Sequence, residues 1–278
     1  MINGTCLTVK GEPVLIFSAI NEIRAISVRS HIYTPVDTNL PHAVGVAFDH
    51  LDLRVYWTDA AGGKETIMSK KLSSDGEDGK DTLVVSGLDM PEQLAVDEYN
   101  KNLYFTESHH QLIGVCSLSG AGCHVLLSGL EKPRGIAIHH KSRQIFYSDW
   151  GVNKPHIGRV GLNGEGATKL ITDNIVWPNG VAVDQVEDRV YWADSTLDII
   201  ETIKIDGTDR RTVLTGQKIH PYSLAVFEDT LYWSDWVVME ILSCNKYTGK
   251  NFKTVVKEAG IHVSISFFIL LDLKRSIF

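Results

Sequence analysis

The sequence predicts an all-β fold: a six-bladed β-propeller of four-stranded antiparallel blades, closed by pairing the N- and C-terminal segments in one blade. One observation is an aromatic tetrad that starts at 56, 104, 146, 191 and 232, so that successive copies lie 48, 42, 45 and 41 residues apart. The copies read YWTD, YFTE, FYSD, YWAD and YWSD. The other is an apolar run that precedes each tetrad, reading VGVAFD, QLAVDE, GIAIHH, GVAVDQ and SLAVFE.

Each repeat reads as four short strands in order. The apolar run follows a proline and forms the first, inner strand, and the tetrad forms the second; the prolines are Pro41, Pro91, Pro133, Pro178 and Pro221. An alternating third strand ends in a turn such as LNG or YTG, and a β-branched run such as RTVLTG forms the fourth. No helical period appears, which favours strands throughout.

The tetrads are predicted to be architecture. Side chains of a strand alternate between its faces, and a blade is covered on both, so the paired aromatic rings should both be buried. The hydroxyl and the acid that follow can satisfy backbone donors across the seam between blades. We therefore expect a structural role, not a catalytic one, for Asp59, Glu107, Asp149, Asp194 and Asp235.

The sixth blade is predicted from residues 15–39, where LIFS is followed by two further strand-like runs. This segment lacks a preceding inner strand, so that strand is expected from the C-terminus, which removes open sheet edges. The propeller is thus assigned to 11–260. Residues 261–278 diverge from the repeat: Val263 to Leu270 can supply the closing strand, or the segment is a truncation artefact, the alternative that the loss of the repeat favours.

Composition narrows the function classes. A net charge of −7 without a basic run argues against nucleic-acid binding. The longest apolar stretch, SISFFILL at 264–271, is too short to span a bilayer, and the N-terminus shows no secretory leader. No phosphate-binding glycine loop, metal motif or cofactor motif is present, so no cofactor is expected.

Four cysteines are present, and none belongs to a CxxC pair. Cys116 and Cys123 flank a Gly/Ser turn between two β-like runs, so they are expected to form a hairpin disulfide; the alternative is two buried thiols. A disulfide favours an oxidising compartment, as does the glycosylation sequon at Asn3. Cys6 and Cys244 have no evident partner.

The ordered tetrads, together with SDWG at 148–151, WPNGVAVD at 177–184 and SCNKYTGKN at 243–251, resemble the YWTD propeller of the low-density lipoprotein receptor family. The resemblance covers about 6 to 260. It implies that residues 1–10 are the tail of an EGF-like module, with Cys6 as its last cysteine. It also implies an endocytic receptor of the insect vitellogenin, lipophorin or megalin type.

The same resemblance implies partners and location. The propeller would bind cysteine-rich ligand-binding repeats and EGF-like modules of its own receptor, and would take part in uptake of lipoprotein or yolk-protein ligands and their release in acid. It would lie outside the plasma membrane and in endosomes, as part of a larger single-pass receptor.

One mouth of the propeller is expected to carry the residues that follow the prolines: His42, Glu92, Arg134, Asn179 and Tyr222. This ring contains one carboxylate, whereas a calcium-dependent propeller hydrolase needs several oxygen ligands converging on its channel. An enzyme is therefore not expected, and no metal site is assigned. The alternatives are that hydrolase and a signalling or matrix propeller that binds short peptides on its top face.

Aromatic and charged residues near the same mouth form the predicted protein-binding set, since tryptophan, tyrosine and arginine are enriched at binding hot spots. The alternative is that the tryptophans only pack loops between blades. The resemblance matches Trp150, Trp177 and His220 to a face that meets ligand-binding repeats in acid, and Asp198 to the place of a second histidine. A histidine changes charge in that pH range, although a single surface histidine is often incidental. The full set is Glu92, Arg134, Trp150, Trp177, Asn179, His220, Tyr222 and Trp236.

Overall fold

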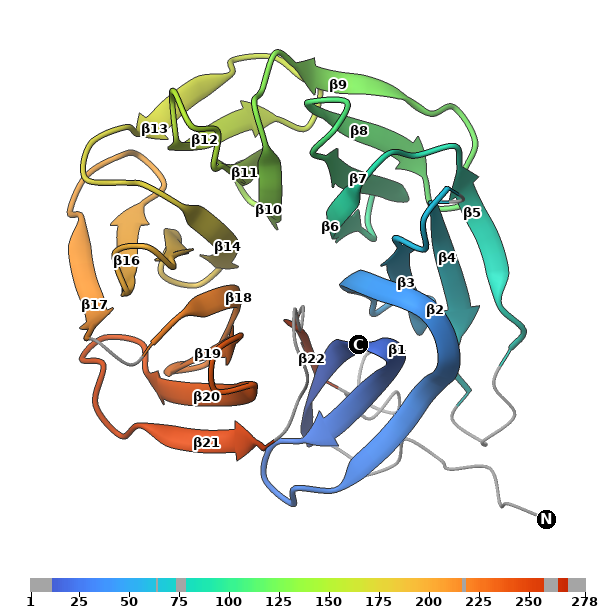
Figure 1. Ribbon diagram of the computed structural model, residues 1–278, viewed down its shortest axis with the longest axis horizontal. Helices are drawn as coiled ribbons and strands as arrows, with labels where there is room; N and C mark the ends of the chain where they lie inside the picture. Colours follow the sequence, from blue (N-terminus) through green and yellow to red (C-terminus); the bar gives the residue numbers. More distant parts are fainter. Residues whose placement is uncertain (1–11, 64, 74–78, 217–218, 258–264, 270–278) are drawn as a thin grey trace, which may run out of the picture.

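The computed structural model describes residues 12–63, 65–73, 79–216, 219–257 and, for the backbone, 265–269. Over these residues the chain forms strands and turns without a helix, and its five sheets surround a central axis (Figure 1). Four sheets have four strands each, running in sequence order from the axis outward. These are β6 (Pro91–Asp97), β7 (Asn102–Glu107), β8 (Leu112–Ser117) and β9 (His124–Ser128); β10 (Pro133–His139), β11 (Gln144–Asp149), β12 (His156–Gly161) and β13 (Thr168–Ile171); β14 (Pro178–Asp184), β15 (Arg189–Asp194), β16 (Ile199–Lys204) and β17 (Arg211–Thr215); β18 (Pro221–Phe227), β19 (Thr230–Asp235), β20 (Glu240–Asn245) and β21 (Lys253–Val256).

The fifth sheet has six strands, so the prediction of six separate four-stranded blades is wrong: the structure has five sheets. Its order is β22 (Ile265–Ile269), β1 (Pro13–Ser27), β2 (Tyr33–Asp49), β3 (Arg54–Asp59), β4 (Thr66–Lys71) and β5 (Thr82–Ser86). The reason lies in β2, which continues through Pro41 without a turn. Ala43 is partnered by Ile20 on one side and by Asp59 on the other, so the N-terminal strands and the first tetrad share one ladder.

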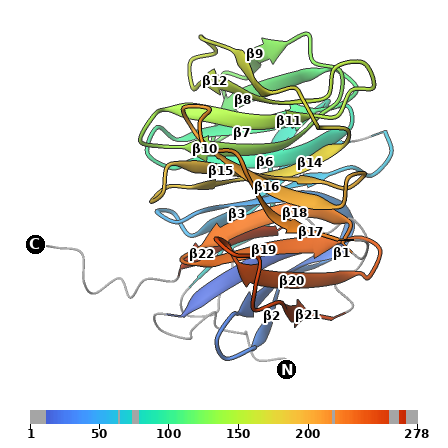
Figure 2. The same cartoon turned by 90° about the vertical axis from the view of Figure 1, so that its left-hand side faces the viewer.

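The two ends of the described chain do meet in this sheet, as the sequence predicts. Strand β22 pairs antiparallel with β1, from Pro13 opposite Ile269 to Phe17 opposite Ile265. The inner strands β6, β10, β14 and β18 surround the axis with β2 and β22, and the side view shows successive sheets packed on one another (Figures 1 and 2). No helix within the described ranges is long and apolar enough to cross a membrane.

The paired aromatic rings of the tetrads are buried on opposite faces of their strands. Trp192 packs in a cluster with Phe146 of the preceding sheet, whereas its neighbour Tyr191 packs with Trp233 of the following sheet. Trp192 and Trp233 are fully buried and Tyr191 nearly so. Each tetrad therefore contributes one ring to each seam, as predicted from its alternation.

The tetrad hydroxyls connect neighbouring sheets. Thr58 Oγ1 donates to the carbonyl of Glu92 at 3.0 Å, and Thr106 Oγ1 donates to the carbonyl of Arg134 at 2.7 Å. The tetrad at 191–194 has an alanine in place of the hydroxyl residue, and there Asn179 Nδ2 donates across the seam to the carbonyl of Pro221 at 3.3 Å. These bonds satisfy buried carbonyl groups between blades.

The tetrad acids act on loops within their own sheet. Asp149 accepts the backbone N–H groups of Glu131 and Lys132, before the inner strand, and that of Gly151 after the tetrad. The other acids accept comparable bonds, with donors from Ala61 to Asp59, Asp89 to Glu107, Val176, Trp177, Thr196 and Leu197 to Asp194, and His220, Val237 and Val238 to Asp235. The carboxylates thus hold together the loops at one end of the propeller.

The structure contains the predicted disulfide between Cys116 and Cys123, which links the end of β8 to the residue before β9. Cys244 is a buried free thiol, and burial raises its pKa to about 11. Cys6, Asn3 and the expected EGF-like tail at 1–10 lie outside the described residues, as do 261–264 and 270–278 of the divergent C-terminal segment.

Candidate protein-binding site

Three tryptophans form a continuous aromatic row on the face held by the tetrad acids. The rings of Trp150 and Trp177 lie 5.2 Å apart between centroids at an angle of 32°, and those of Trp177 and Trp236 lie 6.4 Å apart at 80°. Each backbone is fixed: the N–H of Trp177 donates to Asp194 and that of Trp236 to the carbonyl of His220. The residues come from three different sheets, so the row crosses two seams.

Two cations cover one end of this row. Lys132 Nζ lies 4.2 Å from the ring centroid of Trp150, and the Arg134 guanidinium lies 4.7 Å from the same centroid. A cation over an indole face is attracted by the ring quadrupole. Lysine and arginine side chains here therefore add positive charge directly beside a large apolar contact surface.

Arg134 also connects the row to the buried layer beneath it. Its Nη1 donates to Asn179 Oδ1 at 2.8 Å, its Nε lies 3.4 Å from Glu92 Oε2, and its guanidinium stands 5.3 Å from the ring centroid of Tyr222. Burial raises the pKa of Tyr222 to about 12, while the Arg134 charge opposes that shift, so the phenol is neutral at physiological pH. The only carboxylate of the predicted ring is thus already occupied by a guanidinium.

All eight predicted binding residues belong to one network of contacts. Some of them are buried and the others are partly exposed. Glu92, Asn179 and Tyr222 are buried, so they support the face from below and do not present a contact surface, contrary to the expectation that they face the rim. The tryptophans, Arg134 and His220 are partly exposed. Burial of the residues after the prolines follows from their position on inner strands, where neighbouring sheets converge.

His220 lies at the edge of the aromatic row opposite an acid. Its Nε2 is 3.6 Å from Asp198 Oδ1, and both side chains are partly buried. A positive charge on His220 would therefore be locally balanced by Asp198. Asp198, which the resemblance matches to the place of a second histidine, is thus an acidic neighbour of His220.

Exposed apolar residues in the loops at this end of the propeller were not predicted. Val152 is 84 % exposed and Val237 is 58 % exposed, and both lie in the turn that follows a tetrad. Exposed apolar side chains can contribute to an interaction surface. The available signal was an apolar residue in a position where turns are usually polar. The exposed apolar residues in these loops are Met90, Val152, Val176, Leu197, Val237, Val238 and Met239.

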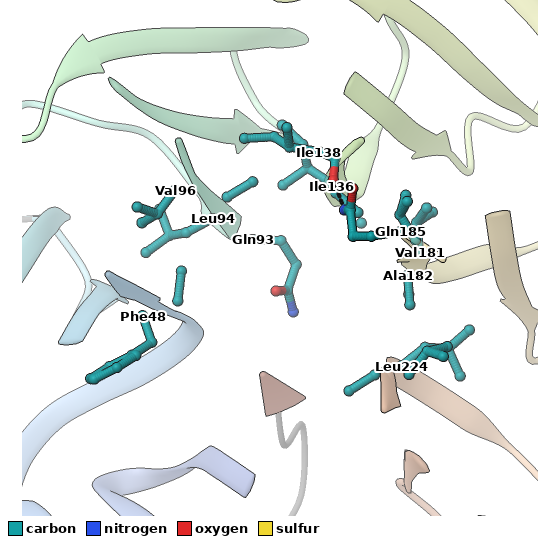
Figure 3. A pocket seen from close by; sticks show the side chains of 18 of the residues that line it. Phe48, Gln93, Leu94, Val96, Ile136, Ile138, Val181, Ala182, Gln185 and Leu224 are labelled. Carbon is teal, nitrogen blue, oxygen red and sulfur yellow. Dashed lines mark hydrogen bonds between the residues drawn. The ribbon is translucent and has the colours of Figure 1, made fainter. Parts of the chain in front are cut away.

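Behind this face a central cavity of about 560 Å³ follows the axis of the propeller (Figure 3). Inner-strand side chains line it, most of them apolar, such as Phe48, Leu94, Ile136, Val181 and Leu224, while Gln93 points into the space. Among the residues that the structure describes, no group of three or more histidine, cysteine, aspartate or glutamate side chains is arranged to hold a metal ion. The walls resemble a packed core more than a set of converging oxygen ligands.

Comparison with known proteins indicates the family to which the chain is related. The family model for the low-density lipoprotein receptor repeat class B matches residues 143–185 and 188–228. Over 271 residues, 94 % of its length, the chain is 39 % identical to the vitellogenin receptor Yl of Drosophila melanogaster. Over 249 residues, 89 % of its length, it is 36 % identical to the vitellogenin receptor of Solenopsis invicta. The chain spans only 13 and 14 % of these two curated relatives.

Solved structures agree on the architecture. A chain from the crystal structure of a nidogen/laminin complex superimposes with a TM-score of 0.85 at 22 % identity, covering 93 % of this chain and 99 % of that one. A gluconolactonase from Xanthomonas campestris superimposes with a TM-score of 0.65 at 17 % identity, covering 79 and 77 %. Both likenesses concern the fold alone. The repeats, the curated relatives and the propeller architecture together make the chain a YWTD-repeat β-propeller of the low-density lipoprotein receptor family.

Proposed function

We propose that this chain is the extracellular propeller of an endocytic lipoprotein-type receptor of the vitellogenin-receptor class, and that it binds protein without catalysis. The similarity to two insect vitellogenin receptors over most of the chain supports this class. The EGF-like modules, cysteine-rich ligand-binding repeats and membrane span would belong to the remainder of the receptor. Its ligands would be lipoproteins or yolk proteins, taken up at the plasma membrane and released in endosomes.

The observation that carries the proposal is the aromatic row of Trp150, Trp177 and Trp236 with Lys132 and Arg134 at one end. Partly exposed tryptophans can lose water on docking, and adjoining cations favour an acidic partner. Cysteine-rich repeats that bind calcium present such acidic surfaces. In acid they would dock on this face and give up their ligand.

The proposal is tested by measuring how the purified chain binds the calcium-loaded cysteine-rich repeats of its own receptor at pH 7.4 and 5.5. We expect stronger binding at pH 5.5. Trp177→Ala should weaken it roughly thirtyfold, since hot-spot truncations remove about 2 kcal/mol or more. Tyr99→Ala is the matched control, because Tyr99 is 70 % exposed but follows the opposite end of an inner strand.

Other outcomes separate the alternatives. Equal loss of binding in both variants would refute the assignment of this face. Binding of short peptides to the face, without binding to the repeats at either pH, would favour a signalling or matrix propeller. Calcium-dependent hydrolysis in an esterase or lactonase screen would contradict the non-catalytic assignment.

A further inference from the structure

The opposite mouth of the central cavity carries a second group of chemically active side chains. The inner strands β2, β6, β10 and β14 end there, and the residue after each strand, or the next one, reaches the cavity. The cavity lining at this mouth includes His50, Glu98, His140 and Gln185. This mouth is separated from the aromatic row by the length of the inner strands, because that row stands where those strands begin.

Glu98 is the carboxylate in the cavity lining at this mouth, and no lysine or arginine of the described ranges pairs with it. Its Oε1 lies 3.9 Å from His50 Nδ1. Its side chain is only 13 % exposed. Burial raises the pKa of Glu98, and the nearby charges of Asp49 and Asp97 act in the same direction.

The cations near this mouth are already engaged elsewhere. Lys101 lies 2.9 Å from Asp52 and 3.3 Å from Asp49. Lys141, which also lines the cavity, lies 3.0 Å from Asp188. An additional cation at Glu98 would therefore meet an excess of negative charge.

The wall behind Glu98 is apolar. Phe48, Val96, Ile138, Val183 and Val226 are among the residues that line the same cavity of about 560 Å³. A partly buried carboxylate at the mouth of an apolar cavity matches a ligand with a positive end and a hydrocarbon stem. A strongly hydrated dication would have to give up its water against this wall, which disfavours it.

We propose that this mouth binds a primary ammonium group carried on an aliphatic chain, with the ammonium at Glu98 and the chain in the apolar cavity. Two sources share this chemistry: a small amphipathic amine and a lysine side chain of another protein. The site is distinct from the aromatic row and does not depend on the receptor assignment.

Acid should release such a ligand. His50 faces Glu98, Asp49 and His140, and His140 faces Asp97 at 4.0 Å and His50, with the ring of Tyr99 against its edge. Burial lowers the pKa of both histidines, so they are neutral at pH 7.4 and gain charge on acidification. Two positive charges would then stand where the ammonium binds, and Glu98 would be paired internally.

The test is calorimetric titration of the 278-residue chain with octylamine, octanol and a blocked peptide containing one lysine, at pH 7.4 and 5.5. Octylamine should bind at pH 7.4 and octanol about tenfold more weakly, because it lacks the charge. Binding of the lysine peptide with similar strength would identify a protein side chain as the ligand, and its failure to bind would identify a small amine.

Variants make the result specific. Glu98→Gln should weaken octylamine about tenfold, whereas Glu187→Gln, which removes an exposed carboxylate outside the cavity lining, should leave binding unchanged. The double variant His50→Gln/His140→Gln should bind at pH 7.4 and lose most of the weakening at pH 5.5. Equal affinity for octylamine and octanol, or equal effects of the two glutamate variants, would overturn the proposal. If circular dichroism shows that the double variant does not fold, two comparisons still test the proposal. These are octylamine against octanol, and Glu98→Gln against Glu187→Gln.

Discussion

At the scale of single residues, the charge distribution of the aromatic row depends on which charged side chains lie beside each tryptophan. Lys132 and Arg134 lie over Trp150, while His220 lies 3.6 Å from Asp198 at the other end of the row. Two cations therefore stand at one end of the row, and a histidine beside a carboxylate stands at the other.

The first prediction concerns this pair. Asp198→Asn should steepen the acid enhancement of binding to calcium-loaded cysteine-rich repeats, since protonated His220 would then add an unbalanced positive charge. His220→Ala should flatten it. Surface plasmon resonance at pH 7.4 and 5.5 provides the measurement. If both variants keep the wild-type ratio of affinities, His220 plays no part in the pH response.

At the scale of structural elements, the seams between blades depend on buried polar contacts as well as on aromatic packing. Lys246, which follows β20, reaches Asp184 at the end of β14 with an Nζ–Oδ2 distance of 2.6 Å, and both side chains are 4 % exposed. Burial by itself lowers the pKa of Lys246, but its hydrogen bond to Asp184 and the charge of that carboxylate outweigh burial and raise it. The lysine is thus charged and bridges two sheets.

We expect Lys246→Met to destabilise the propeller by about 3–5 kcal/mol, because it leaves Asp184 buried without its counter-charge. The matched control is Lys141→Met, which breaks an exposed pair with Asp188 and should change the free energy of unfolding by about 0–1 kcal/mol. Urea unfolding followed by tryptophan fluorescence measures both. A loss of less than about 1 kcal/mol for Lys246→Met would contradict a bridging role.

At the scale of the whole molecule, histidines couple stability to pH. Burial lowers the pKa of His50, His139, His140 and His156 below the usual value near 6.5. The unfolded chain then binds more protons than the folded one as pH falls below that value, so the free energy of unfolding falls with pH. His110 acts in the opposite direction, because its hydrogen bond to Glu107 raises its pKa.

Four histidines with a lowered pKa against one with a raised pKa predict a net loss of stability in acid. The melting temperature should be lower at pH 5.5 than at pH 7.4. His139→Gln should reduce the difference between the two pH values, because His139 is fully buried and contributes one of the unfavourable protonations. Differential scanning calorimetry on both proteins measures this. A higher melting temperature at pH 5.5 than at pH 7.4 in the wild type would refute the prediction.

The sequence by itself determined the features that rest on local contacts and on the repeat. The tetrads predict strands with a buried ring on each face, as Tyr191 and Trp192 show, because alternation along a strand needs no distant information. The disulfide between Cys116 and Cys123 likewise joins residues only 7 apart. The family followed from the order of such local motifs.

Tertiary structure alone decided features that depend on residues far apart in the chain. The merger of the N-terminal strands with the first tetrad into one sheet depends on how far β2 extends, which no turn residue marks. Inner strands of different sheets converge around the axis, and this convergence buries Glu92, Asn179 and Tyr222. It also brings Arg134 into contact with Glu92 and Asn179. The contact between Glu98 and His50 also joins different sheets, because side-chain environment is set by the neighbours that packing supplies and not by position in the repeat.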